Sequence, residues 1–126
     1  LYPEVQFHMI DGTGKKIMVV NEVIEALKLT NATAKQIRAE EWKGAKVDFV
    51  VSRAVAQLDK LIPWIKPLLK KKQLHAYPNG LFAWKGGNIH QEMEAIDQGE
   101  YMELFPISEI FEEDYFQGKY IVYVQG

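Results

Sequence analysis

The sequence predicts an α/β fold in which the last strands of the sheet run antiparallel. Two observations carry this prediction. In the first half of the chain, short apolar runs typical of strands alternate with apolar residues at helical spacing. Near the end, the runs YMELFPI and KYIVYVQ suit a pair of closing strands. The length of 126 residues allows one core of ordinary size and not two, so residues 1–126 are expected to belong to a single domain.

The first half of the chain is expected to run strand, helix, strand, strand. A strand over residues 5–10 ends at a glycine-containing turn. An amphipathic helix follows, because apolar side chains recur at helical spacing between residues 17 and 27. Further strands are expected over residues 33–38 and 47–52, and the second of these is apolar enough to be buried on both faces.

The second half is expected to begin with an interrupted helix. The apolar pattern over residues 58–69 is helical, but Pro63 and Pro67 each remove a backbone hydrogen-bond donor, so the segment should kink or split. The remaining expected elements are a strand over residues 80–84, a short helix over 89–96, and closing strands within 101–107 and 119–125.

Composition excludes several classes of protein. The formal net charge of -2 argues against a polycation that grips nucleic acid by charge alone, so any RNA contact must be regional. There is no cysteine, and His8, His75 and His90 show no ligand spacing, so no metal site is expected. No apolar run approaches the roughly 20 residues that a membrane helix requires. A soluble, cytoplasmic protein without a membrane partner is therefore expected.

Asp11 opens the first candidate site, in the strand-to-helix turn DGTG. Glycines there resemble the start of a dinucleotide fingerprint, but Ile17 stands where that fingerprint needs a small residue. Asp11 would also set a carboxylate beside the pyrophosphate. A carboxylate at the end of a strand suits the two hydroxyls of a ribose better. The alternative is an ordinary helix-capping aspartate in a turn.

Two further candidates follow the next two strands. Ala39 and Glu40 would lie at the same sheet edge, where a small side chain and a backbone amide can border a flat base, although such a glutamate also suits a solvated turn. Arg53 would point into the crevice at the carboxyl end of its strand, where α/β sheets place ligands, and could contact a carboxylate, a phosphate or a base edge. The alternative for Arg53 is an ion pair with Asp48 or Glu41.

Four lysines are weaker candidates for contacts with RNA phosphates. Lys70, Lys71 and Lys72 end the interrupted helix, and such runs are also typical of solvated helix ends. Lys85 precedes two glycines at the end of a strand, where ordinary turn chemistry is the alternative.

Taken together, four stretches resemble one family. The stretches PEVQFHMIDGTGKKIMVVNEV, IRAEEW, DFVVSRAVAQLDKLIPWIKPLLK and LFAWKGG are similar, in this order, to the bacterial 16S ribosomal RNA guanine-N7 methyltransferases known as RsmG or glucose-inhibited division protein B, in a form like those of the Bacteroidetes. The resemblance covers nearly the whole chain. The order of RAEE, SRAVAQLDKL and KGG is its most specific part.

The resemblance implies a Rossmann-like fold that binds S-adenosylmethionine and transfers its methyl group to a guanine N7 of 16S ribosomal RNA. By position, it implies that Asp11 meets the ribose, that Ala39 and Glu40 border the adenine, and that Arg53 lies between the cofactor and the target guanine as the catalytic residue. Two other classes stay open: an NAD(P)-dependent oxidoreductase, which would use the DGTG glycines, and a non-catalytic interaction module.

The chain departs from this family at its start. Members carry a first strand and a glycine-rich loop before the stretch that aligns with Leu1, and the sequence has neither, so we expect an N-terminally truncated, incomplete fold that is inactive by itself. The missing strand would lie between the strands of residues 5–10 and 47–52. The sheet should therefore have a gap or re-paired strands, and its open edges favour a homodimer or a strand-swapped association.

Overall fold

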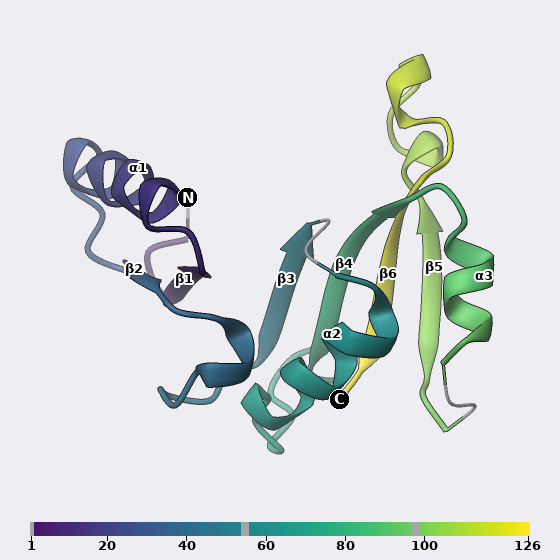
Figure 1. The fold of residues 1–126 in the computed structure, drawn as a ribbon, viewed down its shortest axis with the longest axis horizontal. Helices are drawn as coiled ribbons and strands as arrows, with labels where there is room; N and C mark the ends of the chain where they lie inside the picture. The colour runs from purple at the N-terminus through teal and green to yellow at the C-terminus, as the bar shows by residue number, and fades with distance from the viewer. Residues whose placement is uncertain (1, 54–55, 97–98) are drawn as a thin grey trace. The chain divides into compact units, whose positions relative to one another are not determined.

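The computed structural model describes residues 2–53, 56–96 and 99–126 (Figure 1). The chain forms two compact units, Leu1–Lys43 and Gly44–Gly126. Each unit has a sheet of its own, with two strands in the first unit and four in the second. The expectation of one domain over residues 1–126 stays a prediction.

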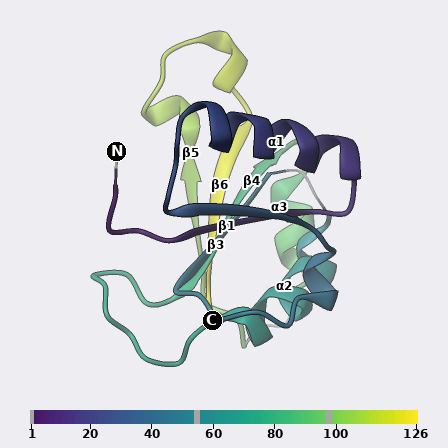
Figure 2. The ribbon, with the colours of Figure 1, turned by 90° about the vertical axis from the view of Figure 1, so that its left-hand side faces the viewer.

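The first unit is a β-α-β arrangement followed by a short turn of helix. Its elements are β1 (Phe7–Asp11), α1 (Gly14–Ala26), β2 (Ala32–Gln36) and the 3-10 turn η1 (Ala39–Glu41). β1 and β2 pair in parallel, with Asp11 opposite Gln36. α1 runs alongside this pair (Figures 1 and 2) and buries Ile17. The three elements expected from the sequence here are confirmed, with boundaries shifted by one to three residues.

The second unit combines a parallel strand pair with two antiparallel ones. Its helices and strands are β3 (Phe49–Arg53), α2 (Leu58–Ile65), β4 (Gly80–Gly86), α3 (Ile89–Glu94), β5 (Met102–Pro106) and β6 (Lys119–Gln125), with 3-10 turns η2 (Lys66–Leu68), η3 (Ile107–Glu109) and η4 (Asp114–Phe116). The strand order is β3-β4-β6-β5. β3 pairs with β4 in parallel, and β6 is antiparallel to both β4 and β5, which confirms the expected antiparallel closing strands.

One face of this second sheet carries the core of the unit. α2 and α3 lie on the same side of the sheet in Figure 2. The buried apolar side chains on and beneath these helices are Leu58, Leu61, Ile62, Ile65, Ile89, Leu81, Ala83, Val122 and Val124. α2 ends at Ile65 and the chain continues as η2, with Pro67 inside that turn. The expected split of this helix is therefore confirmed, because the proline breaks the regular hydrogen-bond pattern.

The opposite face of the second sheet is more open. β3 is an outer strand, and Val51 in its centre is 68% exposed. The expectation that this strand would be buried on both faces is thus wrong in the structure. The helices α2 and α3 cover one face of the sheet, and Val51 lies on the other face. Among the described residues, β1 pairs with β2 and β3 pairs with β4, in two separate sheets, so the expectation of a gap or of re-paired strands stays a prediction.

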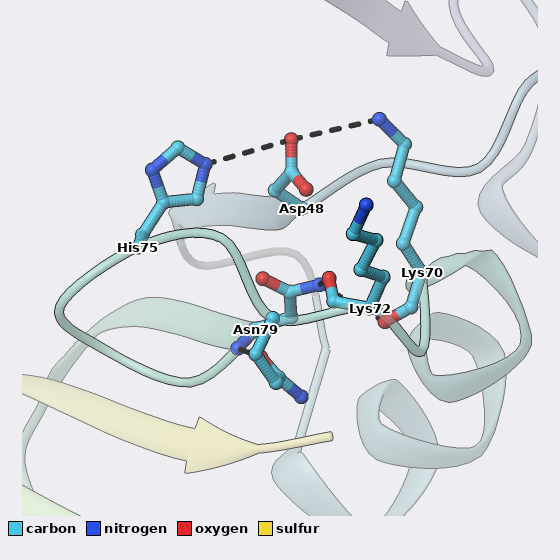
Figure 3. A network of polar contacts seen from close by, with 6 residues as sticks. Asp48, Lys70, Lys72, His75 and Asn79 are labelled. Atoms are coloured by element: carbon cyan, nitrogen blue, oxygen red, sulfur yellow. Dashed lines mark hydrogen bonds and ion pairs between the residues drawn. The ribbon is translucent and has the colours of Figure 1, made fainter.

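The loop between η2 and β4 is tied down from within. Asn79, which is 1% exposed, donates from its side-chain amide to the carbonyls of Lys70 and Lys72 at 3.0 and 2.9 Å. Asp48, just before β3, lies 3.7 Å from both Lys70 Nζ and His75 Nε2 (Figure 3). These contacts hold the three consecutive lysines at the amino ends of β3 and β4.

None of the helices in the described parts of the chain is long and apolar enough to cross a membrane.

We expect Asn79→Ala to lower the free energy of unfolding by about 1–3 kcal/mol, because the carbonyls of Lys70 and Lys72 lose a buried side-chain donor. Urea denaturation of the complete protein measures this change. The control is Asn88→Ala, because Asn88 is exposed and makes no side-chain capping bond at α3, so its loss should change stability by less than about 0.5 kcal/mol. Equal effects of the two substitutions would contradict the role given to Asn79.

Candidate cofactor and nucleic-acid site

Asp11 is the last residue of β1, and its two carboxylate oxygens make different contacts. Oδ1 accepts the backbone N–H of Thr13 at 2.7 Å, and Oδ2 lies 3.9 Å from Lys16 Nζ. The first contact closes an Asx turn before α1, whose N-cap is Thr13 and has no side-chain capping bond, so Asp11 shapes the turn and does not cap the helix itself. The side chain is still 37% exposed, and Oδ2 keeps the capacity to accept hydrogen bonds from a ligand.

The same contact disfavours a phosphate-binding loop in this turn. A dinucleotide fingerprint presents free backbone N–H groups to the pyrophosphate. Here the Thr13 N–H is already bound by the Asp11 carboxylate, which would also repel a phosphate. The turn is therefore suited to a neutral hydroxyl group and not to an anion.

Ala39 and Glu40 reach the same edge of the first sheet as Asp11. The N–H of Ile37 donates to the carbonyl of Asp11 at 3.0 Å, which extends the β1–β2 ladder by one bond. The η1 turn follows, with Ala39 half-buried and Glu40 exposed. The structure thus brings three of the predicted cofactor residues together at one carboxyl edge.

Arg53 ends β3 in the second unit, and its side chain is exposed. Asp48, one of the two carboxylates considered as its ion-pair partner, is engaged by Lys70 and His75 at the other end of the strand. Arg53 and Asp11 belong to different units, so the crevice that they are expected to share stays a prediction.

Trp84 is a neighbour of Arg53 that the sequence analysis missed. The two residues are partners in the parallel β3–β4 ladder, so their side chains lie on the same face of the sheet. Trp84 is 44% exposed. An indole beside a guanidinium is typical of surfaces on which proteins stack an unpaired nucleobase. The sequence contained a signal for Trp84: it is an aromatic residue at the end of the expected strand over residues 80–84, just as Arg53 follows the expected strand over residues 47–52.

Lys85 points to the other face and makes internal contacts. Its Nζ donates to the carbonyl of Ala56 and lies 3.0 Å from Glu92 Oε1. Glu92 Oε1 also accepts the backbone N–H of Leu58 at 2.6 Å. Lys85, which was expected to contact RNA, therefore already has two partners within the fold. Its contact with RNA stays a prediction. Glu92 was not predicted at all.

The three consecutive lysines lie away from Arg53. Lys70, Lys71 and Lys72 precede β4, whereas Arg53 is at the carboxyl end of β3, which is parallel to β4. A strand of five residues spans roughly 16 Å. An RNA that touched both would have to extend along the full length of the strand.

Tyrosines surround Glu103 on the open face of the second sheet. Tyr77 and Tyr101 donate their hydroxyls to its carboxylate at 3.2 and 2.5 Å. Burial, followed by the Glu103 charge, raises the pKa of Tyr77, and the hydrogen bond to Glu103 is the main cause that raises the pKa of Tyr101. Burial likewise raises the pKa of Tyr123. These hydroxyls stay protonated near neutral pH, so they act as donors and not as bases.

Among the residues that the structure describes, no group of three or more His, Asp or Glu side chains is placed to hold a metal ion.

The chain is similar in sequence to proteins named ribosomal RNA small subunit methyltransferase G. It is 44% identical over 124 residues to the protein of Phocaeicola vulgatus and 45% identical over 125 residues to that of Bacteroides thetaiotaomicron. These matches cover 98% and 99% of this chain but 58% and 59% of the relatives. The chain therefore spans a little under three fifths of the length of these relatives.

Solved structures of methylases share the fold. An rRNA methylase of Streptococcus thermophilus has a TM-score of 0.65 at 10% identity, and a putative rRNA methylase of Clostridium thermocellum has 0.64 at 11%. Each match covers 95% of this chain and 72% of the other. A putative methyltransferase of Streptococcus mutans, solved in complex with SAH, has a TM-score of 0.59 at 13% identity over 94% of this chain and 74% of the other.

These comparisons confirm the expected methyltransferase fold, present in part, and the resemblance that the four sequence stretches indicated. The model of the GidB family, described as rRNA small subunit methyltransferase G, matches residues 1–108, and the chain belongs to this family.

Proposed function

We propose that the complete protein transfers a methyl group from S-adenosylmethionine to the N7 nitrogen of a guanine in 16S ribosomal RNA. One observation carries the proposal: in a chain that belongs to this family, Asp11 ends β1, and Ala39 and Glu40 follow the carboxyl end of β2, its parallel partner. Ligands of open α/β sheets bind at such edges. Arg53 and Trp84 at the carboxyl end of β3 and β4 supply the surface for the base.

The residues of the first unit fit the adenosine part of the cofactor. Asp11 Oδ2 has the capacity to accept a ribose hydroxyl, since Lys16 Nζ, at 3.9 Å, lies beyond hydrogen-bond distance of it. Ala39 brings a short side chain to the border of an adenine, and the η1 turn presents backbone there. When bound, S-adenosylmethionine supplies the methyl group as a sulfonium.

Arg53 would orient the target without moving a proton. The N7 nitrogen of guanine carries a lone pair in the neutral base, so its methylation requires no strong general base. The main task of the protein is then to align the reacting atoms. A guanidinium can donate two hydrogen bonds in a fixed plane to a base edge or a phosphate, and the neighbouring Trp84 can hold the plane of the base.

The other classes are less well supported. An NAD(P)-dependent oxidoreductase would need the Thr13 N–H that Asp11 binds. If the protein were an interaction module without activity, the placement of the Asp11 carboxylate and the η1 turn at the same carboxyl edge of the β1–β2 pair would have no explanation. A cytoplasmic location, contacts of Lys70 to Lys72 with 16S ribosomal RNA, and a homodimer or strand-swapped association stay predictions of the sequence.

We expect Asp11→Ala in the complete protein to weaken binding of S-adenosylmethionine by about 1–3 kcal/mol, because buried ribose hydroxyls lose their acceptor. Isothermal calorimetry measures this affinity. Asp11→Asn is the matched variant: an amide oxygen can still close the Asx turn with Thr13, so folding stability should be kept while the affinity falls. Unchanged affinity in both variants would remove Asp11 from the site.

We expect Arg53→Lys to lower the single-turnover rate of methyl transfer by at least about tenfold, because an ammonium does not reproduce the planar fork of a guanidinium. Quenched-flow transfer of labelled methyl groups to the small ribosomal subunit or its RNA measures the rate. Lys60→Arg, an exposed change on α2, serves as the control for handling and folding. A wild-type rate in Arg53→Lys would show that Arg53 takes no part in the transfer step.

We expect Trp84→Ala to weaken binding of an RNA that carries the target loop by about 1–3 kcal/mol, the usual worth of one base stacked on an aromatic ring. Trp84→Phe should keep most of the affinity. Fluorescence anisotropy over a range of salt concentrations separates stacking from charge, because loss of a stack leaves the salt dependence unchanged. If Trp84→Ala binds this RNA as well as the wild type does, no base stacks there.

A further inference from the structure

A charged pair in the second unit is withdrawn from water at the carboxyl end of β4. Lys85 Nζ and Glu92 Oε1 are 3.0 Å apart, and their side chains are only 10% and 17% exposed. Removing such a pair from water costs several kcal/mol per ion unless further polar contacts offset the loss. The further contacts of this pair therefore indicate its task.

Both members of the pair bind the backbone of the same short segment. Lys85 donates to the carbonyl of Ala56, and Glu92 accepts the N–H of Leu58, the first residue of α2. Gln57 stands at the N-cap of α2 but makes no side-chain capping bond. A glutamate from another helix thus supplies the cap, and the start of α2 is fastened to both β4 and α3.

This segment follows directly on the arginine of the proposed site. Arg53 is the last residue of β3 and precedes Ala56 by three positions. Its ladder partner in β4 is Trp84, and the next residue of β4 is Lys85. Arg53 is therefore held by the β4 ladder, and the Lys85–Glu92 pair holds the backbone at Ala56 and Leu58, a few positions further along the chain.

We propose that Lys85 and Glu92 are positioning residues that hold Arg53 in place through the backbone at Ala56 and Leu58. The inference rests on the proposed function for the role of Arg53, but the hold on the backbone is independent of it. An apolar pair of similar volume would fill the space as well. An apolar pair could not hold this backbone, because the carbonyl of Ala56 needs a donor and the N–H of Leu58 needs an acceptor.

The hold on the backbone is tested by hydrogen exchange of the complete protein. Glu92→Ala and Lys85→Met should each speed exchange of the amides of residues 56–60 by at least about tenfold, since that segment then opens more easily. The controls are Glu94→Ala, exposed on the same helix, and Lys60→Met, exposed on α2. Glu92→Gln keeps an acceptor for the Leu58 N–H and should fold even if Glu92→Ala does not, with exchange between that of wild type and Lys85→Met.

The link to Arg53 is tested by a double-substitution cycle. Glu92→Gln and Lys85→Met should lower the single-turnover rate of methyl transfer about 10- to 100-fold, with binding of S-adenosylmethionine unchanged. In the Arg53→Lys background the same substitutions should cause little further loss, because the group that they position is already gone. A merely structural pair would lower the rate by the same factor in both backgrounds.

The outcomes separate the two ideas. Unchanged exchange at residues 56–60 would overturn the inference, whatever the activity, and so would rate losses that multiply in the Arg53→Lys background. If the wild-type protein transfers no methyl group to 16S ribosomal RNA, the proposed function fails and the link to Arg53 falls with it. The exchange experiment would then decide whether the pair holds the backbone.

Discussion

The parallel pairing of β3 with β4 sets the positions of Arg53, Trp84 and Lys85 relative to one another. Because both strands end at the same edge, Arg53 and Trp84 become neighbours on one face, and Lys85 is directed to the other. A shift of register by one residue would reverse the faces of β4. Lys85 would then lie beside Arg53, and its pairing with Glu92 beneath the helices would be lost.

Local chemistry explains which parts of this arrangement were predictable. The split of α2 and the turn at Asp11 depend on residues within a few positions, such as Pro67 and Thr13, and the sequence predicts them. Side chains alternate between the two faces of β4, and this alternation places Lys85 on the same face as the buried Leu81 and Ala83. In the sequence, the two glycines that follow Lys85 indicated a turn at this position instead. Glu92 was out of reach, because it caps a helix that begins 34 positions earlier in the chain.

The apolar character of β3 shows where a sequence pattern exceeds what the described chain satisfies. A run such as Phe49 to Val51 is typical of strands covered on both faces, yet Val51 is exposed and β3 has a strand partner on one side only among the described residues. The apolar run therefore predicted the strand, which the structure confirms as β3, but not its exposure.

Two of the lysines that were expected to contact RNA are paired with carboxylates within the second unit. Lys85 is neutralised by Glu92 beneath the helices, and Lys70 is paired with Asp48 at the opposite end of the strands. With a formal net charge of -2, the chain also has no general attraction for a polyanion. Under the proposed function, recognition of RNA at this edge would depend on the geometry of the Arg53 guanidinium and the Trp84 indole, which suit an unstacked base, more than on a general attraction for the RNA backbone. The buried Lys85–Glu92 pair fits that demand, because a site with few contacts requires each of them to be held firmly in place.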